Sequence, residues 1–379
     1  MDPSMLARLL AGPLHLGAGQ VLMMLIGGAL IALAIVKQYE PVLLLPIGLG
    51  VILANIPETG MTSEGGLFSI LYNFGIANEL FPLLIFIGVG AMTDFGPLLE
   101  NPKLVLLGAA AQFGIFGTMM FALLLGGAFP QLGFGLREAA SIGIIGSADG
   151  PTSIYVASIL APGLLGPIAV AAYSYMSLVP VIQPPIMRLL TTKEERMIRM
   201  PYTTRGVSKT ARILFPIVVT LVAGLVAPLS TPLIGMLMFG NLMRESGVVN
   251  RLVNTSANEL INIVTIFLGI TIGATMTADR FLQWQTILII SMGLVAFSLD
   301  TAAGVLFGKL MCVLSGRKVN PLIGASGISA FPMSARVVQK VGQEDDFSNF
   351  LLMHAMGSNT AGQVGSVIAG GVVLALLPG

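Results

Sequence analysis

The sequence predicts an all-α polytopic membrane protein with a transporter-like architecture of two inverted-topology repeats, broken helices and re-entrant hairpins. Three observations predict it: the composition, the pattern of apolar segments, and a match between the two halves of the chain. The 379 residues are 55% hydrophobic and only 10% charged, whereas soluble domains carry about 25% charged residues. The mean hydropathy of +0.90 agrees with a chain that resides in a lipid bilayer.

The apolar segments predict the membrane spans. They cover residues 19–36, 41–56, 79–94, 103–129, 163–190, 211–228, 231–243, 259–277, 284–314 and 347–376. We interpret the run Val21 to Val36 as a retained first span, because no small-residue cleavage site precedes Lys37. Two further stretches, 139–160 and 320–341, are apolar but interrupted by Gly, Ser and Pro. These interruptions are typical of re-entrant hairpins or of broken helices that line a cavity.

Charged loops predict the orientation. The segment 188–212 is the most basic of the chain, and Glu194 and Glu195 are its only acids. Its basic residues are Arg188, Lys193, Arg196, Arg199, Arg205, Lys209 and Arg212. Such clusters stay in the cytoplasm. The loop with Glu58, Glu64 and Glu79 then falls outside. The first hairpin enters from the outside and the second from the cytoplasm.

An internal match predicts two repeats. Gly143, Gly146, Pro151 and Ser153 recur 181 residues later as Gly324, Gly327, Pro332 and Ser334. Matches at offsets of 180 to 187 include Asn55 with Asn241, and Met92-Thr93 with Met276-Thr277. Chance is the alternative explanation in a Gly-rich chain. Repeats of opposite orientation are typical of secondary transporters. We therefore divide the chain into an N-terminal span (1–40), a first inverted repeat (41–190), a basic cytoplasmic linker (191–210) and a second inverted repeat (211–379).

Several kinds of site are excluded by residue counts. Cys312 is the single cysteine and His15 and His354 are the two histidines, so a disulfide and a common zinc motif are excluded. No phosphate-binding loop with the spacing of an ATP site occurs. The net charge of +1 provides no surface for nucleic acid. Uphill transport would thus depend on an ion gradient or on a partner's chemistry.

The most informative motif is the run Gly146-Ser147-Ala148-Asp149-Gly150-Pro151-Thr152. A carboxylate at bilayer depth costs about 2.5–3.5 kcal/mol even on a lenient scale, so it needs a compensating cation, proton or arginine. Glycine and proline break the helix and free backbone carbonyls, while Asn, Ser and Thr at other breaks add neutral oxygens. One carboxylate among neutral oxygens favours sodium or a proton. The plainer alternatives are a helix N-cap for Asp149, helix-to-helix hydrogen bonds for Ser329 and Asn359, and packing for Tyr175.

Ordered motifs extend over most of the chain: GSADGPT (146–152), Tyr175, the segment Asn320–Gly324 with Ser329 and Arg336, and HAMGSNTAG (354–362). In these motifs the chain resembles the β subunit of sodium-translocating biotin-dependent decarboxylases, of the oxaloacetate, glutaconyl-CoA or methylmalonyl-CoA type. The resemblance implies an enzyme in the bacterial cytoplasmic (inner) membrane. It would decarboxylate carboxybiotin, consume an external proton and export Na+, through an elevator-type movement.

The resemblance also implies roles for single residues. Asp149, Asn320, Ser329 and Asn359 are expected to bind Na+. Tyr175 and Arg336 are expected to handle carboxybiotin or its proton, with Asp149 as a third catalytic residue. The expected supporting residues are Gly146, Ser147, Gly150, Pro151, Thr152, Gly324 and Ser358.

The implied partners are an alpha carboxyltransferase subunit, a biotin carrier protein or domain, and a small γ or δ membrane subunit; a homo-oligomer is also allowed. The basic linker is either a docking surface for a cytoplasmic partner or a determinant of orientation alone. A stand-alone Na+-coupled organic-anion carrier and a Na+/H+ antiporter are the alternative functions. Both would share the repeats and the sodium ligands, and only the ordered motifs disfavour them.

Overall fold

The computed structural model describes residues 12–38, 40–201 and 206–377, and every element of regular secondary structure in these ranges is a helix. The first part of the chain forms α2 (Ala18–Val36), α3 (Pro41–Ala54), α4 (Leu67–Leu71), the π-helix η1 (Tyr72–Ile76), α5 (Leu80–Met92), α6 (Gly96–Glu100), α7 (Val105–Ala111), α8 (Phe113–Ala128), α9 (Leu136–Gly143), the 3₁₀-helix η4 (Ile144–Ser147), α10 (Gly150–Leu160), α11 (Leu165–Ser177), α12 (Val179–Leu190) and α13 (Lys193–Arg196). Short 3₁₀ turns connect several of them: η2 (Pro102–Leu104), η3 (Pro130–Leu132) and η5 (Pro162–Leu164).

The second part has a similar succession of elements. It forms α14 (Lys209–Val226), η6 (Pro228–Ser230), α15 (Thr231–Ser246), α16 (Asn250–Thr255), the π-helix η7 (Ser256–Leu260), α17 (Ile261–Thr275), α18 (Ala278–Phe281), α19 (Trp284–Leu314), the 3₁₀-helix η8 (Pro321–Gly327), α20 (Met333–Asp345) and α21 (Leu352–Leu376). Arg205, which the orientation argument used, lies outside the described residues.

Six helices in the described part are long and apolar enough to cross a membrane, or eight if each of two bent pairs is one span. The predicted span 163–190 is one of those pairs, in which α11 and α12 meet at an angle of 66°. The predicted first span is present as α2. The predicted spans 41–56 and 231–243 are shorter helices, of 14 and 16 residues. The all-α membrane class with broken helices is therefore confirmed.

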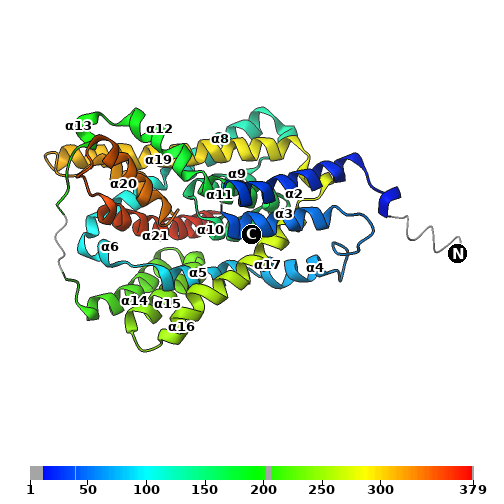
Figure 1. Cartoon of the computed structure of the whole chain (residues 1–379), viewed down its shortest axis with the longest axis horizontal. Helices are drawn as coiled ribbons and strands as arrows, with labels where there is room; N and C mark the ends of the chain where they lie inside the picture. Colours follow the sequence, from blue (N-terminus) through cyan, green and yellow to red (C-terminus); the bar gives the residue numbers. More distant parts are fainter. Residues whose placement is uncertain (1–11, 39, 202–205, 378–379) are drawn as a thin grey trace, which may run out of the picture.

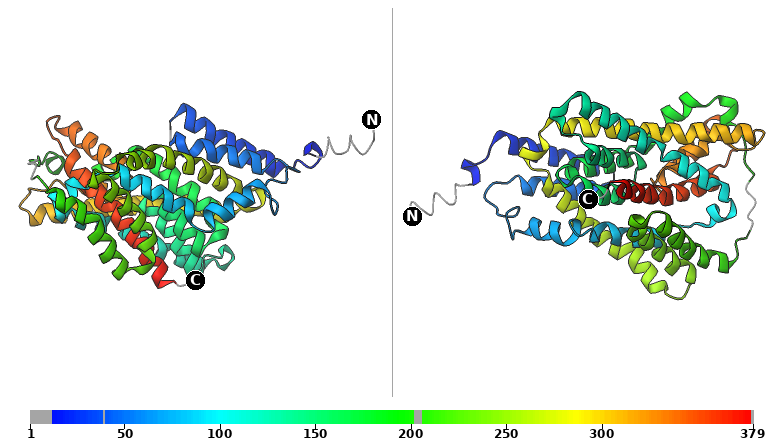
Figure 2. Two further views of the ribbon diagram at one scale, coloured as in Figure 1. Left: turned by 90° about the horizontal axis from the view of Figure 1, so that it is seen from below. Right: turned by 180° about the vertical axis from the view of Figure 1, so that it is seen from behind.

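In Figure 1 and in the view from behind in Figure 2, α21 runs between the helices above it and those below it. Most of its residues are buried, whereas α14 exposes most of its own. Two other helix pairs, α3 with α17 and α5 with α15, approach so closely that glycine is required. A Cβ atom on Gly273 of α17 would lie 2.1 Å from the carbonyl oxygen of Ile47 in α3, and one on Gly240 of α15 would lie 2.1 Å from that of Ile87 in α5. Small residues of this kind are typical of helix interfaces within membranes.

Two asparagines make equivalent contacts across these pairs. The Asn55 side chain donates to the carbonyl of Met276 (2.9 Å) beyond the end of α17, and the Asn241 side chain donates to the carbonyl of Thr93 (3.0 Å) beyond the end of α5. These are the segments that the sequence comparison matched with each other. Each amide provides a partner for a carbonyl that the end of a helix leaves free.

The basic linker binds the end of α20, and α13 and α20 lie at the same end of the bundle as α6, opposite α4 (Figure 1). Arg196 and Arg199 pair with Asp345 (2.5 Å) and Asp346 (2.6 Å), and Arg188 pairs with Glu344. The side chains of Asn320 and Asn349 both donate to the carbonyls of Arg196 and Ile198, at 2.8 to 3.2 Å. The linker is thus fixed to the second broken segment.

The contacts of Arg196 predict a difference between two arginines of this linker. Arg196 is 13% exposed and also donates to the Thr191 carbonyl (2.7 Å), so Arg196→Ala leaves buried acceptors unpaired. We expect a loss of about 1–3 kcal/mol in the free energy of unfolding. The matched variant Arg199→Ala, which removes a side chain that is 64% exposed, should unfold at nearly the wild-type temperature. Thermal unfolding of the purified protein in detergent measures both, and equal midpoints for the two variants would contradict this ranking.

The Arg199–Asp346 pair has a defined pH range. The hydrogen bond from Arg199 lowers the pKa of Asp346. Because the folded-state pKa is the lower one, the contribution of this carboxylate to stability is complete above its unfolded value of about 3.9. It is lost only as the pH falls through the folded value, so the linker stays bound at any pH near neutrality.

Candidate functional site

The first helix break presents Asp149. α9 continues into η4, Ala148 adopts a left-handed conformation (φ +52°), and Asp149 is the N-cap of α10 with Pro151 in the first turn. Proline cannot continue a helix that arrives from before it, which is why the chain breaks here. Gly150 is required by packing, because its Cβ atom would lie 2.0 Å from the ring of Tyr173. The predicted interruption of 139–160 is confirmed.

The second helix break meets the first. η8 ends at Gly327, residues 328–332 are non-helical, and α20 begins at Met333. The backbone N–H of Ser329 donates to the carbonyl of Ser147 at 2.9 Å. The sequence match aligned Ser153 with Ser334, and both donate a hydroxyl to a backbone carbonyl of the preceding segment. Ser153 donates to the carbonyl of Asp149 (2.8 Å), and Ser334 donates to the carbonyl of Ala325 (3.1 Å). The two interruptions therefore form one site.

The Asp149 carboxylate accepts three hydrogen bonds and is only 6% exposed. Its Oδ1 atom accepts from the backbone N–H of Thr152 (3.2 Å). Its Oδ2 atom accepts from the hydroxyls of Ser329 (3.0 Å) and Ser366 (2.7 Å). No arginine, lysine or histidine pairs with it in residues 12–38, 40–201 and 206–377. The N-cap reading is correct, but the carboxylate in addition lacks a counter-charge.

Asn359 of α21 adds an available oxygen. Its amide nitrogen donates to the carbonyl of Ile328 (2.6 Å), the residue before Ser329. Its Oδ1 atom is buried and has no hydrogen-bond partner in the described part of the chain. A buried acceptor without a donor is costly unless something else satisfies it. A carboxylate, an amide oxygen and serine hydroxyls are the oxygen ligands that a small hard cation prefers.

A cavity of about 330 Å³ adjoins Asp149. Its walls are mostly apolar and come from α5, the two breaks, Met176 of α11 and Gln363 of α21. Thr93 and Gln363 contribute polar atoms and are hydrogen-bonded to each other (3.2 Å). A space of this size beside the carboxylate can admit a small ion with several waters.

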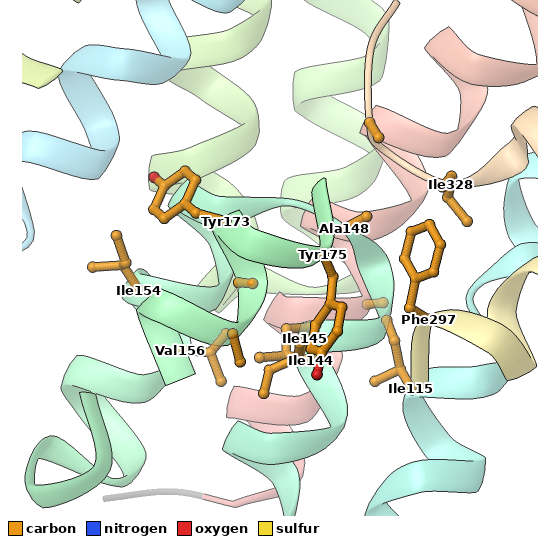
Figure 3. Close-up of a cluster of buried hydrophobic side chains, with 14 of the residues drawn as sticks. Ile115, Ile144, Ile145, Ala148, Ile154, Val156, Tyr173, Tyr175, Phe297 and Ile328 are labelled. Atoms are coloured by element: carbon orange, nitrogen blue, oxygen red, sulfur yellow. The ribbon is translucent and has the colours of Figure 1, made fainter. Parts of the chain in front are cut away.

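Other predicted residues lie away from this cluster. Asn320 is bound to the linker, and its Oδ1 accepts from the N–H of Leu322 (3.0 Å). Tyr175 points away from Tyr173 (Figure 3), packs against Gly293 of α19 and donates its hydroxyl to the carbonyl of Ile290. Arg336 is exposed in the first turn of α20, one turn after the Pro332 that lines the cavity.

The supporting residues have separate positions. Gly146 contacts α19, where its Cβ atom would lie 3.2 Å from that of Ala296, and Gly324 contacts the carbonyl of Gly304 in the same helix. Ser147, Pro151 and Thr152 contribute the contacts at the first break described above. Ser358 is buried, and its hydroxyl has no partner in the described residues.

Sequence reasoning missed Ser366, Thr93 and Asp300. Ser366 lies seven residues after Asn359, which is two helical turns along the same face of α21. Helical periodicity from Asn359 would have found it. Thr93 follows α5 and gives no signal until that helix is placed beside α21. Asp300 is buried in α19.

The chain is similar to known proteins of one kind, the beta subunits of decarboxylases. A family model described as "Na+-transporting oxaloacetate decarboxylase beta subunit" matches residues 19–377. The chain is 52% identical to the oxaloacetate decarboxylase beta chain of Klebsiella pneumoniae, over 96% of each chain. It is 57% identical to the glutaconyl-CoA decarboxylase subunit beta of Acidaminococcus fermentans, over 95% of this chain and 94% of the relative. It is 56% identical to the methylmalonyl-CoA decarboxylase subunit beta of Veillonella parvula, over 97% and 95%.

Proposed function

From the premise that this chain belongs to the family of Na+-transporting oxaloacetate decarboxylase beta subunits, we propose that its buried site couples carboxybiotin decarboxylation to sodium export. The chain is the multi-pass membrane subunit of a decarboxylase sodium pump in a bacterial inner membrane. In the proposed reaction the carboxyl group of carboxybiotin leaves as CO₂. The electron pair of the broken C–N bond stays on nitrogen, which takes up a proton from outside.

The observation that carries the proposal is the uncompensated Asp149 carboxylate where the two breaks meet. Sodium, as the cargo, would be held by Asp149, Ser329 and Asn359, with Ser366 added to the set. Asn320 is left out of this proposed set, because its side chain is engaged with the linker. A cation there would supply the charge that Asp149 lacks and a partner for the free amide oxygen of Asn359.

Export further requires two conformations, which we propose to be related through two inverted repeats. The equivalent contacts of Asn55 and Asn241, and the equivalent π-helices η1 and η7, support the repeats. Moving one Na+ outward against 100 mV costs about 2.3 kcal/mol. The ion can drive a transition only if it binds the two conformations unequally. Neutralisation of Asp149 by Na+ is the proposed source of that difference.

The proposed carboxybiotin site lies towards α20. Arg336 and Lys340 are exposed one turn apart on this helix, and either can pair with the carboxylate of an approaching carboxybiotin. Tyr175 remains a proposed proton carrier. Its hydroxyl is bonded to the Ile290 carbonyl here, so this role requires the hydroxyl to leave that carbonyl in another conformation.

The proposed partners are an alpha carboxyltransferase subunit, a biotin carrier and a small γ or δ membrane subunit. Arg188 at the end of α12, and Arg196 and Arg199 of the linker, are engaged within the chain. The biotin carrier is therefore proposed to approach the face that carries Arg336 and Lys340, in preference to the linker. The comparisons do not favour a stand-alone carrier or an antiporter.

Decarboxylation of free carboxybiotin tests the substrate role of Arg336. The purified complex should release CO₂ only when Na+ is present. Arg336→Ala should raise the KM for carboxybiotin about 10- to 100-fold, because an arginine–carboxylate contact is lost. Arg251→Ala, at an exposed arginine on α16, is the matched control and should behave as wild type. An unchanged KM in Arg336→Ala would remove this residue from the proposed site.

A sodium titration tests Ser366. Ser366→Ala removes the shorter of the two hydroxyl contacts to Asp149 and makes the ionised carboxylate less stable. The sodium concentration for half-maximal turnover should rise about tenfold, since hydrogen bonds to charged groups contribute about 1.5–3 kcal/mol. Ser291→Ala is the control, because the hydroxyl of that exposed serine of α19 donates to the Ile287 carbonyl of its own helix. A midpoint equal to that of wild type would contradict the assignment.

A further inference from the structure

A second carboxylate is buried in the membrane region and has no part in the proposed cycle. Asp300 of α19 is 0% exposed. Neither of its carboxyl oxygens makes a hydrogen bond of ordinary geometry in the described residues, and the nearest donors are the backbone N–H groups of Gly114 and Ile115. These amides belong to the first turn of α8, which begins after the break at Gln112.

The carboxyl group fills a space that two glycines leave open. A Cβ atom on Gly114 of α8 would lie 2.3 Å from Oδ1 of Asp300, and one on Gly146 of η4 would lie 2.2 Å from Oδ2. Asp300 is therefore in contact with three elements: its own helix α19, the start of α8 and the first helix break. Any larger residue at Gly146 would displace the break or the carboxyl group.

This contact is three residues from Asp149. After Gly146 the chain continues with Ser147, whose carbonyl accepts from Ser329 and so aligns the two breaks. A shift of η4 relative to α19 would move Ser147 and Asp149 with it. The distances from Asp149 to Ser329 and Ser366 thus depend on where Asp300 holds Gly146.

Pairing with a charged group does not explain why Asp300 is buried here. α8 (Phe113–Ala128) and η4 contain no charged side chain, and on α19 the nearest one is Lys309, which pairs with Glu195. Tyr175 packs against Gly293, two turns from Asp300 along α19. An isolated carboxylate charge in such surroundings would be costly. The shape of the carboxyl group, which fills the space that Gly114 and Gly146 leave open, therefore remains as its contribution.

We propose that Asp300 is a positioning residue for the sodium site: it holds the first helix break against α19 and α8 so that Asp149 faces Ser329 and Ser366. The inference rests on the proposed function, because the site that it positions is the proposed sodium site. It assigns Asp300 no contact with sodium or carboxybiotin.

The test measures how far Na+ raises the unfolding temperature of the purified complex, together with sodium-dependent turnover. Asp300→Ala should raise the half-saturating sodium concentration about tenfold in both measurements, while kcat at saturating sodium falls by less than about threefold. Asp300→Asn keeps the shape and an acceptor oxygen, so its sodium midpoint should stay within about threefold of wild type. Ser298→Ala, at a neighbouring serine that bonds to the Leu294 carbonyl of its own helix, is the control for changes in α19.

The outcomes separate the two ideas. Sodium stabilisation that is present in wild type and absent in Asp149→Asn supports the proposed function, and its absence from wild type overturns that function. Given a wild-type response, an unchanged midpoint in Asp300→Ala overturns the positioning role. An Asp300→Asn defect as large as that of Asp300→Ala also overturns it, because ionisation would then be what matters.

A double-mutant cycle adds an independent check. Gly146→Ala should impair sodium binding, and it should do so less in the Asp300→Ala background, where the contact with Oδ2 no longer exists. Effects of the two substitutions that simply multiply would contradict the proposed contact.

Discussion

Asp149→Asn is expected to abolish sodium-dependent decarboxylation and sodium transport in reconstituted vesicles. The substitution removes the carboxylate on which Ser329 and Ser366 converge, and it places an amide among their hydroxyls. We expect the half-saturating sodium concentration to rise at least about 100-fold, which corresponds to about 2.7 kcal/mol of lost binding energy. The measurements are the rate of CO₂ release and the uptake of radioactive sodium, both as functions of sodium concentration.

The matched control is Asp279→Asn, at an exposed carboxylate in α18 that does not line the cavity beside Asp149. It should leave both rates at the wild-type level. Full sodium-dependent turnover in Asp149→Asn would refute the central assignment, provided that the variant protein is inserted into the membrane at the wild-type amount.

Gly324→Ala should have the largest effect on stability. A Cβ atom there would lie 2.0 Å from the carbonyl oxygen and 2.6 Å from the carbonyl carbon of Gly304 in α19. Both are backbone atoms and cannot rotate away, so η8 must separate from α19. We expect a loss of about 3 kcal/mol or more in the free energy of unfolding, at the upper end of overpacking effects. Thermal unfolding in detergent and the yield of monodisperse protein report it.

Gly28→Ala provides the comparison for that variant. Gly28 lies within α2, and no heavy atom is within 4 Å of the position that its Cβ would take. Because alanine favours a helix over glycine by about 1 kcal/mol, this variant should be as stable as wild type or slightly more so. Equal unfolding temperatures for Gly324→Ala and Gly28→Ala would show that the two segments can separate freely.

The membrane class and both helix breaks could be predicted because each depends on local chemistry. Composition decides the class, and Gly and Pro around Asp149 and Pro332 interrupt helices wherever those segments are packed. Span lengths were less predictable. The apolar run 163–190 contains a 66° bend. This bend could not be predicted, because hydropathy does not record the direction of a helix axis.

The site was predictable only in part, for a related reason. Asp149, Ser329 and Asn359 occur at or beside the breaks, and the structure brings them together. Asn320 also begins a broken segment, yet it lies beside the linker because seven residues of η8 separate it from the centre. Ser366 lies on a regular stretch of α21, and only its helical phase relative to Asn359 connects it with the site. Tertiary placement, which a single sequence does not contain, made these distinctions.

The two carbonyls shared by Asn320 and Asn349 have one more consequence. Asn320 precedes the segment that carries Ser329, and Asn349 precedes the helix that carries Asn359, so both elements of the candidate sodium site are attached to the same two carbonyls, those of Arg196 and Ile198. A rearrangement of either element would therefore also move the linker at these two carbonyls. If the proposed sodium binding rearranges these segments, a probe attached near Ile198 is expected to report it without any label inside the membrane.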